Sequence, residues 1–156
     1  MAKPPKAKVK VFNYGVQSAQ DYWVLVTRPD VEEFNRLRSP RSLAHVVQSL
    51  WGLLEWHADE YGNGEGFYFQ QCPELAWIKD IAKSAKHRGL YGRREAVADM
   101  GLKQTGQLAY DVAGGYGVPT GGYGSFEPVA ILDDHTEHRL LDFVEKIEAF
   151  WQAQFL

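Results

Sequence analysis

The pair His57 and Glu60 combines two residue types that bind metal ions or transfer protons. Their spacing of three residues would place both side chains on one face of a helix. An imidazole and a carboxylate can then act as metal ligands or as a general base with its partner. However, His57 extends an apolar stripe through Leu50 and Leu54, which is typical of a core histidine. We favour the core interpretation, with a metal site shared with the helix near 73–89 as the alternative.

A second polar cluster lies on that helix, near 73–89. Its members recur at spacings that place them on one helical face, opposite Ile78 and Ala85. The cluster consists of Asp80, Lys83, Ser84 and His87. An ordinary solvated surface is the favoured interpretation, because charged helix faces usually have no other role. The alternative is a polar patch that binds phosphates or an acidic partner.

Two further features could carry chemistry, and we favour a structural role for each. Residues 133–138 contain two histidines and three acids, which could bind a divalent metal. Aspartate is also common in turns for backbone reasons, so we predict a turn there. Cys72 precedes Pro73 at a predicted helix start, where the helix dipole favours a thiolate. A buried or capping role is favoured for Cys72, and we predict no resident metal and no cofactor.

A glycine-rich segment carries the tetrapeptide Gly-Gly-Tyr-Gly twice, at 114–117 and 121–124. Glycine lets the backbone swing, and tyrosine offers a ring on which a base or a partner side chain can stack. The segment therefore predicts a mobile flap that presents Tyr116 and Tyr123. A hairpin tip without a role is an equally good interpretation.

Composition excludes several classes of protein. The chain has 156 residues, enough for one domain, and its 45% hydrophobic content excludes a disordered chain. Its single cysteine excludes an intrachain disulfide, and no apolar run is long enough to span a membrane. We therefore expect a cytoplasmic protein without a membrane association.

Charge is unevenly distributed around a net value of −3. Residues 1–10 carry four lysines and no acid, while residues 126–156 carry seven acids against two basic residues. Residues 79–94 carry six basic residues against one acid. Such separation creates local potentials that the small net charge hides. Together with Tyr116 and Tyr123, these basic residues are the predicted binding residues: Lys79, Lys83, Lys86, Arg88, Arg93 and Arg94.

Hydrophobic periodicity and turn residues predict the elements that position these groups. The first helix covers about 17–27, and a short one restarts at Pro29, with Asp30 as N-cap and Glu33 completing a capping box. Further helices are expected over about 40–59, with Ser39 as cap, 73–89 and 140–155, and a loop over 61–66. Strands are expected over about 102–112 and 127–132, with a third short strand after the turn at 133–136.

These elements predict a mainly helical α+β fold. Four or five helices form a bundle, and a small antiparallel β-sheet is inserted before the C-terminal helix. Residues 1–10 form a flexible basic arm, and 11–156 form a single domain with a β-hairpin insertion at about 102–139.

The stretch 72–87, which begins Cys-Pro and ends Lys-His, and the later Phe150-Trp151 pair are similar to a group of uncharacterised bacterial and phage helical proteins. That group resembles the HEPN superfamily over about 40–155. The resemblance implies a helical bundle, and HEPN proteins include ribonucleases and nucleotide-binding partners. Their ribonuclease signature has an arginine four to six residues before a catalytic histidine. Only His87 can match that histidine, and no arginine precedes it at those positions.

The missing arginine favours binding over cleavage. The leading hypothesis is a non-catalytic binding protein with a HEPN-like bundle, which engages a protein or a nucleic acid, RNA rather than DNA. A homodimer and an origin in a phage or mobile element are compatible with this hypothesis. The alternative is a metal-independent ribonuclease that uses His87 with Lys83 or Arg88, and with Asp80 beside them.

Overall fold

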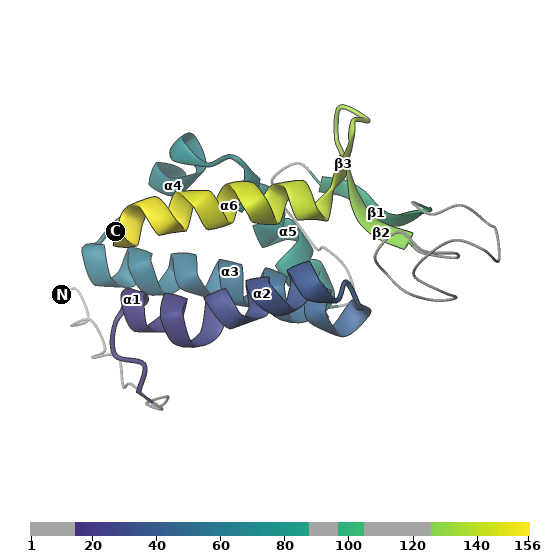
Figure 1. Cartoon of the computed structure of the whole chain (residues 1–156). Coiled ribbons are helices and arrows are strands. Elements are labelled where there is room, and N and C mark those ends of the chain that lie inside the picture. The colour runs from purple at the N-terminus through teal and green to yellow at the C-terminus, as the bar shows by residue number, and fades with distance from the viewer. Residues whose placement is uncertain (1–14, 88–96, 105–125) are drawn as a thin grey trace.

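The structure is a computed structural model, which describes residues 15–87, 97–104 and 126–156. In these ranges the chain is mainly helical, with a small antiparallel sheet ahead of the C-terminal helix (Figure 1). The predicted fold class is therefore confirmed. The predicted arm at 1–10 lies outside the described residues.

The N-terminal helical segment is continuous. It consists of α1 (Ala19–Tyr22), a π-helical turn η1 (Trp23–Thr27) and α2 (Arg28–Arg36). The predicted restart at Pro29 is wrong, and so is the N-cap role of Asp30, because the helix does not break between the two segments.

The π-helical turn explains how the helix passes Pro29. Proline has no backbone N–H and its ring crowds the carbonyl four residues earlier. In η1 the Arg28 N–H instead reaches the Trp23 carbonyl, five residues back, which widens the helix just before the proline. The Asp30 carboxylate is consequently released from the capping role and is available for other contacts.

Helix α3 (Pro40–Tyr61) follows the prediction closely. The Ser39 hydroxyl accepts from the Ser42 N–H at 3.1 Å, and the Ser42 hydroxyl accepts from the Ser39 N–H at 2.9 Å, which makes a capping box. The helix ends at Gly62, whose φ of 71° is the left-handed conformation that favours glycine. It extends two residues past the predicted end.

Three helices complete the bundle: α4 (Glu65–Gln71), α5 (Glu74–His87) and α6 (Leu140–Phe155). Helix α4 was not predicted, because the glycine-rich residues 61–66 were interpreted as a loop. It forms because Tyr68 is buried against the core, with 1% of its surface exposed. Helices α5 and α6 match the predicted segments.

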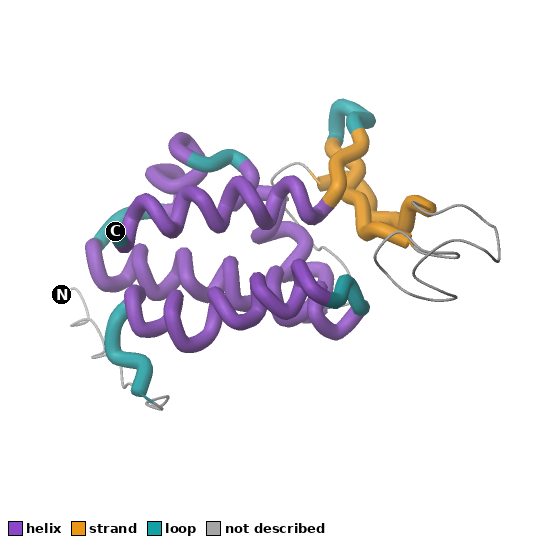
Figure 2. Tube along the Cα trace, in the orientation of Figure 1, coloured by secondary structure: helices purple, strands orange, loops and turns teal. Residues whose placement is uncertain are grey.

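The sheet has three antiparallel strands in the order β1-β2-β3: β1 (Val97–Gln104), β2 (Phe126–Leu132) and β3 (Glu137–Arg139). It lies at one end of the bundle, where α6 begins (Figure 2). The second and third strands were predicted. The first begins at 97, earlier than the predicted 102, and residues 105–112 lie outside the described ranges.

The core gathers around α3, which packs against the N-terminal segment on one side and α5 on another. Burial of each large apolar side chain contributes about 1.5–3 kcal/mol. The described helices include none that is long and apolar enough to cross a membrane. The largest fully buried side chains are those of Trp151, Tyr68, Phe34, Phe143, Leu50, Leu53 and Leu54.

Asp80 joins α5 to the sheet. Its Oδ2 accepts a hydrogen bond from the Val97 N–H at 3.1 Å, and the residue is 2% exposed, whereas Ala85 is exposed. The predicted assignment of Asp80 to a solvated polar face, opposite Ala85, is therefore wrong. The side chain is buried because β1 packs against α5 at this point, which the helix pattern alone does not reveal.

We expect Asp80→Ala to lower the free energy of unfolding by about 1–3 kcal/mol, because it leaves a buried N–H without its acceptor. Asp80→Asn keeps an acceptor oxygen and should cost less. Asp142→Ala is the control, since it removes an exposed carboxylate paired with Arg139 and should cost less than about 1 kcal/mol. Urea unfolding measures all three, and equal effects of Asp80→Ala and Asp142→Ala would contradict the assignment.

Candidate binding cleft

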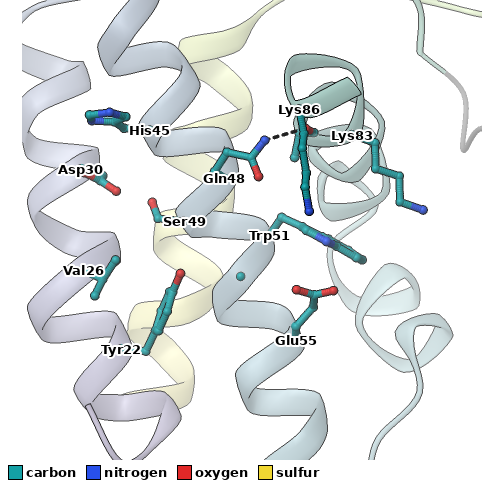
Figure 3. Close-up of a pocket in the computed structure, with 12 residues that line it drawn as sticks. Tyr22, Val26, Asp30, His45, Gln48, Ser49, Trp51, Glu55, Lys83 and Lys86 are labelled. Atoms are coloured by element: carbon teal, nitrogen blue, oxygen red, sulfur yellow. Dashed lines mark hydrogen bonds between the residues drawn. The ribbon is translucent and has the colours of Figure 1, made fainter. Parts of the chain in front are cut away.

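An open cleft of about 590 Å³ lies among the described helices. The N-terminal helical segment, α3 and α5 form its walls (Figure 3). Clefts of this size accommodate a small molecule or a short segment of another chain. The described lining consists of Tyr22, Val26, Asp30, His45, Gln48, Ser49, Trp51, Gly52, Glu55, Ala82, Lys83 and Lys86.

Helix α3 contributes a polar stripe to the cleft, beside the apolar stripe that enters the core. The stripe is His45, Gln48, Ser49, Gly52 and Glu55, whose spacings of one and three residues place them on one helical face. The Gln48 amide donates a hydrogen bond to the Ala82 carbonyl at 2.6 Å, which ties α3 to α5 at the cleft.

The N-terminal segment contributes Tyr22, Val26 and Asp30, which recur every four residues along one face. Val26 lies in η1, and π-helical turns are frequent at functional sites. Burial, followed by the carboxylates of Asp30 and Glu55, raises the pKa of the Tyr22 hydroxyl. At neutral pH the hydroxyl is therefore protonated and available to a ligand as a hydrogen-bond donor.

Gly52 lets the Tyr22 side chain lie close against α3. A Cβ at position 52 would lie 2.5 Å from the Tyr22 hydroxyl oxygen and 3.1 Å from Cζ, which is too close for either atom to stay in place. The Tyr22 ring also packs on Trp56, with 5.5 Å between ring centroids. Gly52 therefore lets the Tyr22 side chain form the cleft wall close to α3.

Helix α5 contributes Lys83 and Lys86, both exposed. The Lys86 side chain extends toward Trp51, and the Lys83 side chain extends outward from the helix (Figure 3). Within the described residues neither ammonium makes an ion pair. They give the α5 wall a positive charge, while Asp30 and Glu55 give the other two walls a negative one.

Lys79 differs from Lys83 and Lys86 because it is buried. Its ammonium pairs with Glu65 at 2.5 Å and lies over the rings of Trp51 and Phe69, at 5.5 and 5.6 Å from their centroids. Lys79 thus holds α4 against α5 and α3, and its charge is engaged within the protein.

Of the remaining predicted site residues, Asp80 has a described side chain, and it does not line the cleft. Asp80 is bound to the Val97 N–H, as described above. His87 is the last residue of α5, and its side chain is outside the described set. The other predicted binding residues also lie outside the described ranges: Arg88, Arg93, Arg94, Tyr116 and Tyr123.

His57 is a core residue, as favoured from the sequence. It is 8% exposed, its Nδ1 lies 2.7 Å from the Tyr68 hydroxyl, and its ring stacks on Tyr61. Burial lowers the pKa of the imidazole, and the Glu60 charge partly opposes that shift. Glu60 itself accepts from the Ala19 N–H at 2.6 Å, so it anchors the start of α1 and does not form a ligand pair with His57.

Residues 133–136 form the predicted turn between β2 and β3, and Glu137 and His138 begin β3. The Asp134 carboxylate accepts from the Thr136 N–H at 2.9 Å and from its hydroxyl at 2.6 Å. These bonds lower the pKa of Asp134. The aspartate therefore has the backbone role that such residues have in turns.

Comparison of the chain with family models, curated proteins and solved structures finds no match in any of the three.

Sequence reasoning missed the residues that form most of the cleft, because three separate helices supply them. Tyr22 and Glu55 were not singled out, and Asp30 was assigned to a cap. The available signal was the polar stripe of α3, in which Gly52 is the only residue without a side chain. A small residue amid a polar helical face indicates that another element approaches closely there.

A double-mutant cycle tests the contact between Gly52 and Tyr22. Alanine in a helix interior is about 0.5–1 kcal/mol more favourable than glycine, so Gly52→Ala should stabilise a Tyr22→Ala protein by that amount. In the wild-type background the displaced Tyr22 ring should cancel this gain. Urea unfolding of the four proteins measures the coupling, and an equal gain in both backgrounds would mean that the two residues are not in contact.

Cys72 should react slowly with alkylating agents. The residue is 4% exposed, and burial, together with the neighbouring Glu74, raises the pKa of its thiol to about 12. Because the thiolate is the reactive form, we expect native protein at pH 8 to react with iodoacetamide about 100-fold or more slowly than urea-unfolded protein. Rates within a few-fold of each other would show that Cys72 is an accessible thiolate.

Proposed function

We propose that this chain is a non-catalytic binding protein that takes a mixed-charge segment of a partner protein into the cleft. The observation that carries the proposal is the separation of charge across the cleft. Lys83 and Lys86 line one wall, and Asp30 and Glu55 line the other two. A polypeptide can present an acidic side chain to the lysines and a basic or amide side chain to the carboxylates.

A protein partner suits this cleft better than a nucleic acid. The phosphates of an RNA strand would be attracted by Lys86 but repelled by Asp30 and Glu55 across the same opening. A peptide places opposite charges a few ångströms apart, so it can complement both walls. Charge complementarity of this kind gives specificity and a faster association rate.

The ribonuclease alternative has less support from the site. It would use Asp80 together with His87 and Lys83, whereas the Asp80 carboxylate is buried and bound to the Val97 N–H. In the described part of the cleft, no nucleophile is hydrogen-bonded to a base. The HEPN-like resemblance stays a prediction that these observations do not test.

Selection from a random peptide display library tests the proposal. Wild-type protein serves as bait, and enriched peptides should contain at least one Asp or Glu. Their affinity should fall about tenfold or more for Lys83→Glu/Lys86→Glu, because like charges then face each other. The matched control is Arg36→Glu/Arg41→Glu, which makes the same change of charge at exposed residues outside the cleft lining.

Two outcomes would contradict the proposal. The first is that enriched peptides bind the lysine variant and the arginine variant equally well. The second is that a single-stranded RNA oligonucleotide binds the wild type at low salt, loses its affinity in the lysine variant alone, and no peptide is enriched. That second result would assign the cleft to nucleic acid.

A further inference from the structure

We infer that Asp30, Glu33 and His45 form a binding site for a divalent transition-metal cation at the edge of the cleft. Asp30 and Glu33 lie one turn apart on α2, and His45 comes from the first third of α3. One ligand atom from each residue lies within 4.8 Å of the others. This inference goes beyond the proposed function and does not depend on it.

The three side chains are not engaged elsewhere in the described structure. Within those residues none of them makes a hydrogen bond or an ion pair. Asp30 does not cap a helix, because α2 continues through this position. Asp30 and Glu33 are half-buried and His45 is exposed, so an ion could enter from solvent.

The geometry requires only a small contraction to hold an ion. Zinc binds imidazole nitrogen and carboxylate oxygen at about 2.0–2.2 Å, so ligand atoms around one ion lie about 3–3.5 Å apart. Rotation of three partly exposed side chains can close the remaining gap. Two carboxylates and a neutral imidazole carry a charge of −2, which a divalent cation neutralises. Without a cation, the two negative carboxylates lie close together and repel each other.

The donor set indicates the class of cation. Magnesium and calcium prefer oxygen ligands, whereas imidazole favours zinc and its neighbours in the first transition row. Three protein ligands leave at least one coordination position for water or a ligand group. Asp30 and His45 also line the cleft, so that position adjoins the space where a partner would bind (Figure 3).

Calorimetric titration of tag-free protein with Zn²⁺ alone tests the site. We expect one Zn²⁺ per chain, a melting temperature that rises with Zn²⁺, and much weaker binding of Mg²⁺. His45→Ala should weaken Zn²⁺ binding at least tenfold and abolish the thermal shift. Glu33→Gln should have the same effects. This second variant is needed if circular dichroism shows that His45→Ala alters the fold.

His135→Asn is the matched control. It removes an exposed histidine from the turn at 133–136, within the other segment whose sequence could bind metal, and asparagine tolerates the positive φ of that position. Unchanged Zn²⁺ affinity in this variant supports the site. No binding by the wild type, loss of binding in His135→Asn, equal affinity for Mg²⁺, or full affinity in both His45→Ala and Glu33→Gln would each overturn it. Because the titration contains no peptide, its failure leaves the proposed function standing.

Discussion

Burial of the apolar face of α3 is the interaction on which the rest of the structure depends. Val46, Val47, Leu50, Leu53 and Leu54 are fully buried, and α3 packs against the N-terminal segment and α5. A helix of this length needs such tertiary contacts, because helical propensity alone stabilises it only marginally. The N-terminal segment, α4 and α5 are positioned by contacts with α3, and α6 packs on α5 and α2.

The cleft is a consequence of the same packing. The polar flank of α3 lines the cleft between the N-terminal segment and α5. Gly52 lets Tyr22 approach from one side, and Gln48 binds the Ala82 carbonyl on the other. The opening between these two contacts is lined by charged groups from all three elements. The cleft therefore has separated charges because each of the three elements contributes its own charged residues to the opening.

The sequence predicted the elements whose signals are local. Helices α3, α5 and α6 have apolar stripes of helical period, and Ser39 and Pro40 mark the start of α3. The continuity of the first helix past Pro29 was missed, because a π-helical turn removes the conflict that normally ends a helix there. The burial of Asp80 depends on where β1 packs, which is a tertiary contact. The cleft was missed for the same reason, since its walls are far apart in sequence.

In the proposed complex, the partner segment places an acidic side chain against Lys83 and Lys86. The most direct measurement is the affinity of a peptide that binds the cleft, and of the same peptide with its acidic residue changed to lysine, for wild-type protein and for Lys83→Glu/Lys86→Glu. We expect reversal of either charge alone to weaken binding and reversal of both to restore it. If the lysine peptide binds the glutamate variant no better than it binds the wild type, the proposed charge pairing does not occur.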